Sequence, residues 1–290
     1  MTTEAPLIGP ARAPDLHVMS FNIRRRMPFS RAGGPDRWAE RAPLVRALLD
    51  AERPTVLAVQ EALAGQAGAV SEGLGPTYRR LGVGREPGGR GEGAPIFYDA
   101  ERLELTGWRQ RALSATPDVH GSRTASWGNL TRRSVITAGF VDRETGFRIH
   151  VFNTHLDHIS PRARINSATY LARLAADLRL EEPDAAIVVT GDFNADERSA
   201  VHGRLTGDGP FLDAWDLADE HLTPAWRTYS GYRRRRLGRR IDHILVAGPV
   251  RVARAGVNAV RFAGRAASDH DPVQALLRPA TAPPTEGAAR

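Results

Sequence analysis

Short apolar runs alternate with segments of helical periodicity along most of this chain. Runs such as residues 56–60 (VLAVQ) and 186–190 (AIVVT) are apolar at nearly every position, which predicts strands buried within a sheet. Helices must then cover such sheets, so the alternation limits the fold to layers of strands and helices. The predicted strands cover residues 16–22, 56–60, 96–98, 135–141, 148–153, 186–190, 241–246 and 273–277.

The order of these segments predicts an α+β fold. Residues 38–52 and 162–180 have helical periodicity, and Pro54 ends the first of these helices. Residues 141–149 (VDRETGFRI) predict a hairpin connection and therefore antiparallel pairing within a mixed sheet. We expect a four-layer α/β/β/α sandwich, in which two packed mixed β-sheets are flanked by helices.

The chain predicts one domain with a tail at each end. No internal linker interrupts residues 15–278, which we assign to a single domain. Residues 1–14 and 279–290 are rich in Pro and Ala, so we expect both tails to be disordered.

The absence of cysteine limits the chemistry of any site. With 0 Cys the chain has no disulfide, no thiolate nucleophile and no Cys-based zinc site, so a metal must bind through oxygen and imidazole. No apolar run reaches the roughly 18–20 residues that span a bilayer, and residues 1–14 do not resemble a signal peptide. We expect a cytoplasmic monomer without a membrane span.

Polar side chains recur where the predicted strands begin or end. Each one alone has a structural explanation, because Asp and Asn are common turn formers and helix caps and a single His is often a satisfied structural imidazole. Together they favour one site, because ligands bind beyond the rigid ends of strands. The residues are Asn22, Glu61, His155, Asp192, Asn194, Asp242, Asp269 and His270.

These residue types suit metal-dependent chemistry on phosphate. Carboxylates with amide and water ligands suit hard cations such as Mg²⁺ or Mn²⁺. Hydrolysis of a phosphodiester needs a metal, a group that orients and deprotonates water, and donors for the developing negative charge. The chain offers Glu61 and Asp269 for the metal and Asp192 for the water. It offers Asn194, His155 and His270 as donors.

In this order, the segments that carry these residues resemble the endonuclease/exonuclease/phosphatase superfamily, which has a DNase I-like fold. The resemblance runs from about residue 16 to 277. Within the superfamily, the sequence most resembles a bacterial branch whose substrate is unassigned, and this branch is nearest to the deadenylase and nocturnin type. The matching segments are SFNIR (20–24), VLAVQE (56–61), IFYDAERLEL (96–105), FNTHLDH (152–158), TGDFNAD (190–196), RRIDHIL (239–245) and SDHDPV (268–273).

The resemblance implies a metal side and a role for each of its residues. Glu61 is the principal metal ligand, Asn22 lies beside it and contacts metal or phosphate, and Asp269 completes the metal side. The implied cofactor is Mg²⁺ or Mn²⁺.

The resemblance also implies a catalytic set. Asp192 orients or deprotonates the attacking water, and Asn194 steadies the pentavalent phosphate. His155 and His270 bind phosphate oxygens or act as acid near the leaving group. Asp242 hydrogen-bonds His270, which holds its tautomer and raises its basicity.

Further residues are expected to bind substrate. Arg133 matches a phosphate-contacting Arg of the family, although a buried ion pair or a surface position would explain it equally well. Glu92 lies six positions before Tyr98, where some nucleases of the family carry a Glu that pairs with the His at position 155. Tyr98 is included in the same substrate-binding set.

Two positions depart from the family pattern. His243 replaces a common Tyr, and we expect this change to be tolerated behind the site. Ser230 replaces a His that is frequent in this branch, and this change is expected to alter substrate contacts but not the metal chemistry.

The basic charge leaves the substrate open. The net charge is +7 and all 40 basic residues are Arg, which fits either a nucleic-acid partner or a GC-rich coding bias. Residues 223–240 combine Trp226, Tyr229 and Tyr232 with the six Arg that lie between positions 233 and 240. This pattern can stack bases and follow a phosphate backbone but also occurs in solvated loops. We place Tyr229 and Tyr232 in the substrate-binding set.

The sequence therefore predicts a divalent-metal-dependent phosphoesterase that hydrolyses phosphodiester bonds. Its predicted activity is of the nuclease type, on RNA, single-stranded DNA or a nucleotide. One alternative is a phosphatase or phosphodiesterase of a small molecule such as an inositol or sugar phosphate. Another is a catalytically inactive scaffold that binds nucleic acid.

Overall fold

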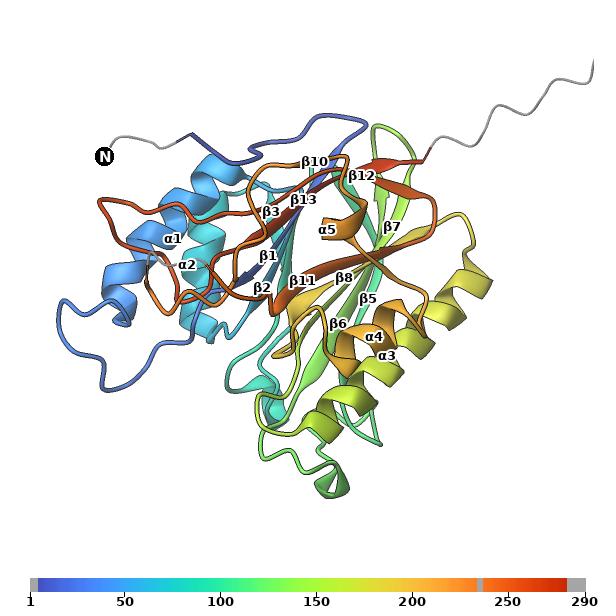
Figure 1. Ribbon diagram of the computed structural model, residues 1–290, viewed down its shortest axis with the longest axis horizontal. Helices are drawn as coiled ribbons and strands as arrows, with labels where there is room; N and C mark the ends of the chain where they lie inside the picture. The colour runs from blue at the N-terminus through green and yellow to red at the C-terminus, as the bar shows by residue number, and fades with distance from the viewer. Residues whose placement is uncertain (1–4, 234–236, 281–290) are drawn as a thin grey trace, which may run out of the picture.

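Two mixed β-sheets pack face to face in the computed structural model, which describes residues 5–233 and 237–280 (Figure 1). Parallel pairing occurs between β1 and β2, between β7 and β8, and between β10 and β12. The first sheet has the order β10 (Glu220–His221), β12 (Val250–Val257), β13 (Val273–Pro279), β1 (Leu16–Asn22), β2 (Val56–Gln60), β4 (Ile96–Asp99), β3 (Tyr78–Leu81). The second has the order β5 (Leu103–Ala112), β6 (Ser134–Asp142), β7 (Arg148–His155), β8 (Ala186–Asp192), β11 (Asp242–Ala247), β9 (Leu212–Asp213).

Helices cover the outer faces of both sheets. The helices α1 (Trp38–Glu52) and α2 (Ala64–Leu74) lie on the first sheet, while α3 (Pro161–Glu181) and α4 (Ala200–Thr206) lie on the second (Figure 1). The four-layer α/β/β/α sandwich that the sequence predicts is therefore confirmed. The remaining short helices are α5 (Ala214–Leu217), η1 (Pro87–Gly89) and η2 (Ala125–Trp127).

The apolar strands are buried on both faces because each sheet has a partner on both sides. In β1, Leu16 and Val18 pack into the core between the sheets, whereas Met19 and Phe21 pack beneath α1 and α2. All the predicted strands and both predicted helices are present, with ends that differ by at most two residues. The elements that were not predicted include the strands β3, β5 and β12 and the helices α2 and α4. Strand β5 lies at a sheet edge and lacks a continuous apolar run, and α2 contains helix-breaking glycines.

Residues 5–14 are not the disordered segment that the sequence predicts. The backbone N–H groups of Leu7 and Gly9 donate to the buried Glu52 carboxylate at 2.7 and 3.0 Å, so this segment is held against the end of α1. At the other end, Pro279 closes β13 and the Ala280 amide donates to the Pro249 carbonyl. The rest of both expected tails lies outside the described residues.

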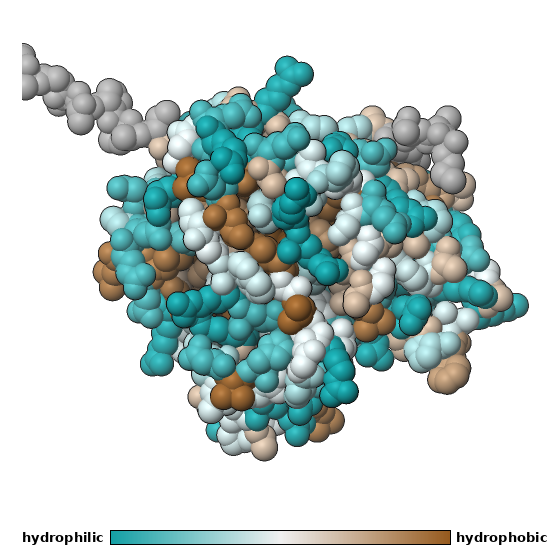
Figure 2. Space-filling model, turned by 180° about the vertical axis from the view of Figure 1, so that it is seen from behind, coloured by the Kyte–Doolittle hydropathy of each residue, from teal (hydrophilic) through white to brown (hydrophobic). Residues whose placement is uncertain are grey.

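The described surface is polar with isolated apolar side chains. Figure 2 shows hydrophilic residues surrounding small hydrophobic patches on the face opposite to the view of Figure 1. Within residues 5–233 and 237–280, no helix has both the length and the apolarity to cross a bilayer.

A buried polar bridge joins the two sheets beneath the strand ends. Asn153, on β7 of the second sheet, donates through Nδ2 to two carbonyls on the side of the first sheet. These are the carbonyls of Val59 and Ala94, at 2.8 and 2.9 Å. Its Oδ1 accepts from Gln60 Nε2 at 2.8 Å. Both side chains are fully buried, so this bridge fixes how the strand ends of one sheet face those of the other.

Replacing Asn153 with Leu is expected to destabilise the protein by at least about 2 kcal/mol, because the buried carbonyls of Val59 and Ala94 lose the Asn153 amide as a donor and Gln60 Nε2 loses its shortest hydrogen bond. Urea unfolding would measure the loss. Asn166→Leu, on the half-buried face of α3, is the matched control and should change stability little. Equal effects of the two substitutions would show that the bridge does not hold the sheets together.

Candidate active site

The predicted strand-end residues come from both sheets and meet at one edge of the sandwich. In the second sheet, cross-strand register places Asp192 opposite His155 on one side and opposite Asp242 on the other. In the first sheet, Asn22 ends β1 and Glu61 follows β2. Asn22 Nδ2 donates to Glu61 Oε1 at 3.1 Å and to Asp192 Oδ2 at 3.0 Å, which joins the two groups.

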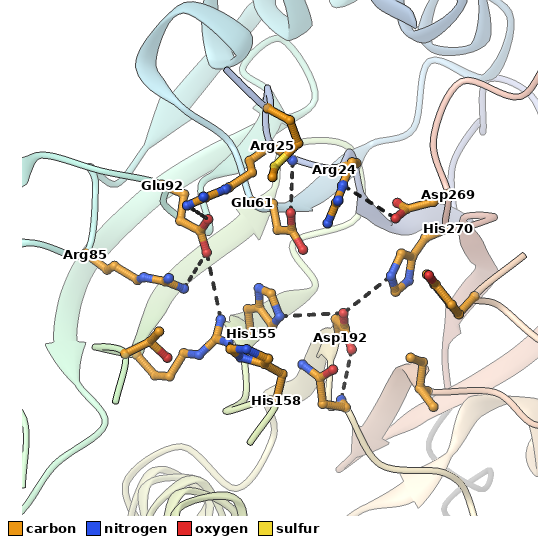
Figure 3. Close-up of a pocket in the computed structure, with 16 residues that line it drawn as sticks. Arg24, Arg25, Glu61, Arg85, Glu92, His155, His158, Asp192, Asp269 and His270 are labelled. Carbon is orange, nitrogen blue, oxygen red and sulfur yellow. Dashed lines mark hydrogen bonds and ion pairs between the residues drawn. The ribbon is translucent and has the colours of Figure 1, made fainter. Parts of the chain in front are cut away.

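Most of these side chains line a cavity of about 520 Å³. Asp192, Asp269 and His270 lie toward one end, with Glu61 and His155 in the middle (Figure 3). Most of the predicted metal and catalytic residues thus share one pocket, and Asn22 and Asp242 are bonded to residues that line it.

Asp192 is the carboxylate around which the site is arranged. Its Oδ2 lies 3.6 Å from His155 Nε2 and 3.7 Å from His270 Nε2, and its Oδ1 accepts the backbone N–H of Asn194 at 2.8 Å. Burial and the neighbouring Asp242 raise the pKa of Asp192 to about 7. A carboxylate with this pKa can accept a proton near neutral pH.

The two histidines have opposite protonation preferences. Burial works against the charged form of His270, but Asp242, which accepts from its Nδ1 at 2.8 Å, and Asp192 together raise the pKa of His270 well above its ordinary value. Burial and the nearby Arg133 lower the pKa of His155 well below its ordinary value. The site therefore pairs a cationic imidazole with a neutral one.

Glu61 and Asn194 are held in a left-handed backbone conformation, with φ of 64° and 47°. Such strain in a residue other than Gly is typical of functional sites, where the surrounding structure supports it. The Glu61 carboxylate accepts the Arg25 N–H at 2.9 Å as well as the Asn22 amide. Although burial opposes ionisation, these bonds lower the pKa of Glu61, so the group is a carboxylate. Asn194 Nδ2 donates to the Leu156 carbonyl.

The acidic side chains at the end of the pocket that holds Asp269 and His270 suit a divalent cation. Asp269 is buried, and this burial raises its pKa, while its carboxylate is 3.6 Å from Arg24 Nε. Carboxylates outnumber cations here, and all the acidic groups offer the oxygen ligands that Mg²⁺ and Mn²⁺ prefer. The carboxylates are Glu61, Asp192, Asp242 and Asp269, and the cations are Arg24 and His270.

Asn22 connects two carboxylates of the site. Its Oδ1 accepts the Arg24 N–H at 2.9 Å, which fixes the orientation of the amide and directs Nδ2 at Glu61 and Asp192. Asn22 therefore holds the two carboxylates in place.

A second buried group of possible ligands consists of His202, Asp213 and His243. The Arg240 guanidinium contacts Asp213 Oδ2 at 3.2 Å, and His202 Nε2 lies 3.0 Å from the same oxygen. Because an arginine already neutralises this carboxylate, the group is a structural ion-pair network. It accounts for His243, which lies behind the site as expected.

Only some of the substrate-binding residues expected from sequence line the pocket. Glu92, Arg133 and Tyr229 line the pocket. Tyr98 was wrongly placed there, since it is buried between the sheets with its ring centroid 4.9 Å from that of Phe140.

Tyr232 also lies outside the pocket-lining set, because its hydroxyl donates to Asp36 Oδ1 at 2.7 Å. Ser230 is buried and donates to the Asp269 carbonyl, so it supports the loop that carries Asp269 instead of contacting substrate.

The basic segment before β11 is partly engaged in ion pairs. Arg239 pairs with Asp196 at 2.8 Å, and Arg240 is buried against Asp213. Residues 234–236 lie outside the described part of the chain. Arg240 is therefore not available to a nucleic-acid backbone.

Four basic residues of the pocket were missed by sequence reasoning: Arg24, Arg25, Arg85 and His158. Arg25 and His158 lie beside or within segments that resemble the family, so proximity to those motifs could have identified them. Arg85 comes from a glycine-rich loop that carries no such signal.

Comparison with known proteins shows the family of the chain. Residues 19–270 match the profile of the Endonuclease/Exonuclease/phosphatase family. A solved family protein from Bacteroides thetaiotaomicron is 29% identical, with a TM-score of 0.83 over 91% of this chain and 94% of that one. A protein named as a mannosyl-6-phosphatase from the same organism is 30% identical, with a TM-score of 0.82 over 90% of this chain and 99% of that one.

The catalytic domain of human Nocturnin shares the fold at 18% identity, with a TM-score of 0.68 over 91% of this chain and 94% of that one. No curated protein sequence matches the chain. Because the profile covers most of the chain and the site residues lie within it, the chain belongs to the endonuclease/exonuclease/phosphatase family, whose members are phosphoester hydrolases.

Proposed function

We propose that this protein is a divalent-metal-dependent phosphoesterase that hydrolyses the phosphodiester bond of a nucleotide or a short single-stranded nucleic acid. One observation carries the proposal: the Asp192 carboxylate lies between His155 and His270, in the same pocket as Glu61 and Asp269. This arrangement combines a proton acceptor, donors for phosphate and acidic oxygen ligands within one cavity.

Glu61 and Asp269 are the proposed holders of Mg²⁺ or Mn²⁺. A cation bound there supplies charge neutralisation for the phosphoryl oxygens. Asn22 holds the Glu61 carboxylate toward the pocket, and Arg25 fixes its other oxygen.

The remaining residues act on the water and on the phosphate. Asp192 orients the attacking water and accepts its proton, because its raised pKa matches that task. His270, held cationic by Asp242, donates to a phosphoryl oxygen or to the leaving group. His155 and the Asn194 amide add neutral donors, which stabilise the extra charge of the transition state.

Tyr229 supports a nucleotide substrate. Its side chain is 50% exposed, lines the pocket and lies edge-on to His270 with ring centroids 5.1 Å apart. An exposed aromatic ring at the mouth of a phosphate site can stack on a base.

A second candidate is a phosphatase acting on a sugar phosphate. It is favoured by the 30% identity to a protein named as a mannosyl-6-phosphatase. The inactive-scaffold alternative is disfavoured, because each acidic and imidazole group that the chemistry needs is present and lies in or against the pocket. A cytoplasmic monomer stays a prediction.

Hydrolysis of bis(4-nitrophenyl) phosphate is expected to require Mg²⁺ or Mn²⁺. Excess EDTA should abolish the rate, and added Mg²⁺ should restore it, because the acidic end of the pocket loses and regains its cation. Turnover that persists in EDTA would contradict the metal proposal. In the same assay format, dinucleotides should be cleaved faster than mannose 6-phosphate, and the reverse order would favour the second candidate.

Asp192→Asn is expected to reduce kcat by about 10²–10⁴-fold, because the water loses its proton acceptor. Asp184→Asn is the matched control, since Asp184 is exposed just before the same strand. Thermal unfolding should show that both variants are folded. A kcat for Asp192→Asn close to that of the control would remove Asp192 from the mechanism.

A further inference from the structure

The end of the pocket away from Asp269 and His270 is basic. Arg25, Arg85 and Arg133 surround a single carboxylate, that of Glu92 (Figure 3). The guanidinium-to-carboxylate distances are 3.5 Å for Arg25, 2.5 Å for Arg85 and 3.9 Å for Arg133. We call these four residues, with His158, the basic end.

Arg133 is buried without sufficient partners. It is only 4% exposed, yet neither its Nε nor its Nη1 has a hydrogen-bond partner among residues 5–233 and 237–280. Its closest contact is a hydrogen bond between Nη2 and His158 Nδ1 at 3.0 Å. Burial and the neighbouring Arg85 lower the pKa of Arg133 to about 10, against the opposing effect of Glu92 and Asp157.

The nearby carboxylates cannot supply the missing partners. Asp157 is 3.8 Å from Arg133 Nε, but its oxygens already accept from the Thr131 hydroxyl and from the Ser160 N–H. Glu92 is shared among three guanidinium groups. Unsatisfied buried donors are costly, so a set that lines a pocket is suited to an incoming acceptor.

A phosphate group has the properties that the basic end lacks. It brings negative charge and several acceptor oxygens, and arginine forks bind such oxygens in pairs. The cleaved phosphate must lie against Asp192 and His270, where the water is activated. Arg85 and Glu92 lie on the far side of His155 from those residues (Figure 3). The two ends are therefore separate positions within one cavity.

We propose that the basic end binds a second phosphate group of the substrate, so that the enzyme prefers compounds that carry another phosphate besides the one it cleaves. This inference rests on the proposed function for the location of the cleaved phosphate. The second phosphate could come from a small bisphosphorylated molecule or from the neighbouring nucleotide of a chain, and the experiment separates these sources.

The test compares three 4-nitrophenyl esters of thymidine 5′-phosphate in Mg²⁺. The first has a free 3′-hydroxyl, the second a 3′-phosphate, and the third a 3′-phosphodiester to another nucleoside. The second or third is expected to have a kcat/KM at least about tenfold higher than the first, which corresponds to about 1.4 kcal/mol. The faster of these two identifies the source of the second phosphate.

Arg85→Gln should remove that gain, so it should lower the rate on the second and third esters much more than the rate on the first. Arg90→Gln is the matched control, because Arg90 is exposed in the same loop, donates to the Pro87 carbonyl and does not line the pocket. It should keep the gain. Equal rates on all three esters would overturn the proposal. So would an equal loss on all three in Arg85→Gln, because the basic end would then serve the cleaved phosphate.

A binding measurement tests the inference without relying on catalysis. If no ester is hydrolysed, the proposed function fails, and calorimetry in EDTA still decides the inference. Thymidine 3′,5′-bisphosphate should then bind wild type at least about tenfold more tightly than it binds Arg85→Gln, with Arg90→Gln unchanged. Identical Kd values in wild type and Arg85→Gln would contradict phosphate binding at the basic end.

Discussion

Asn22 donates hydrogen bonds to carboxylates from both β-sheets, to Asp192 in one and to the residue that follows β2, Glu61, in the other. Its own oxygen is held by the Arg24 backbone, so the amide cannot turn away. The proposed metal side and the proposed water-activating side are therefore aligned by one side chain at the junction of the sheets. Beneath it, the Asn153–Gln60 bridge sets the same relation deeper in the core. The site forms only where the two sheets pack against each other, because each sheet supplies some of its residues.

Charge is distributed unequally along the pocket that this packing creates. At one end of the pocket, the carboxylates are more numerous than the cations. At the other end, several arginines surround the single carboxylate of Glu92. Burial makes both imbalances costly, because charges in a low-dielectric site are poorly screened. A cation at the first end and an anion at the second would relieve both costs. A metal-assisted phosphoesterase brings these two partners together.

Much of the fold and of the acidic end could be predicted from sequence, for one physical reason. Strands buried on both faces are continuous apolar runs, and polar residues at their ends, such as Glu61 and Asp192, stand out against them. The basic end could not be predicted in this way. Arg85 comes from an irregular loop, and only tertiary packing brings it to Glu92. Tyr98 misled the prediction because a tyrosine on an apolar strand looks the same whether it faces a pocket or the core.

The basic segment at 233–240 shows the converse limit. Its composition suggested a surface for nucleic acid, but Arg240 turns inward to Asp213, where His202 and His243 also lie. Sequence pattern does not show which members of an arginine run find acidic partners inside the fold. The arginines that line the pocket come from elsewhere in the chain, at positions 24, 25, 85 and 133.

Anomalous diffraction from crystals grown with Mn²⁺ tests the central claim most directly, because it locates the cation without reference to activity. We predict an anomalous peak in contact with the carboxylates of Glu61 and Asp269, at the acidic end of the pocket. A peak at His202, Asp213 and His243 instead, or Glu61 and Asp269 carboxylates that share no ion, would contradict the account.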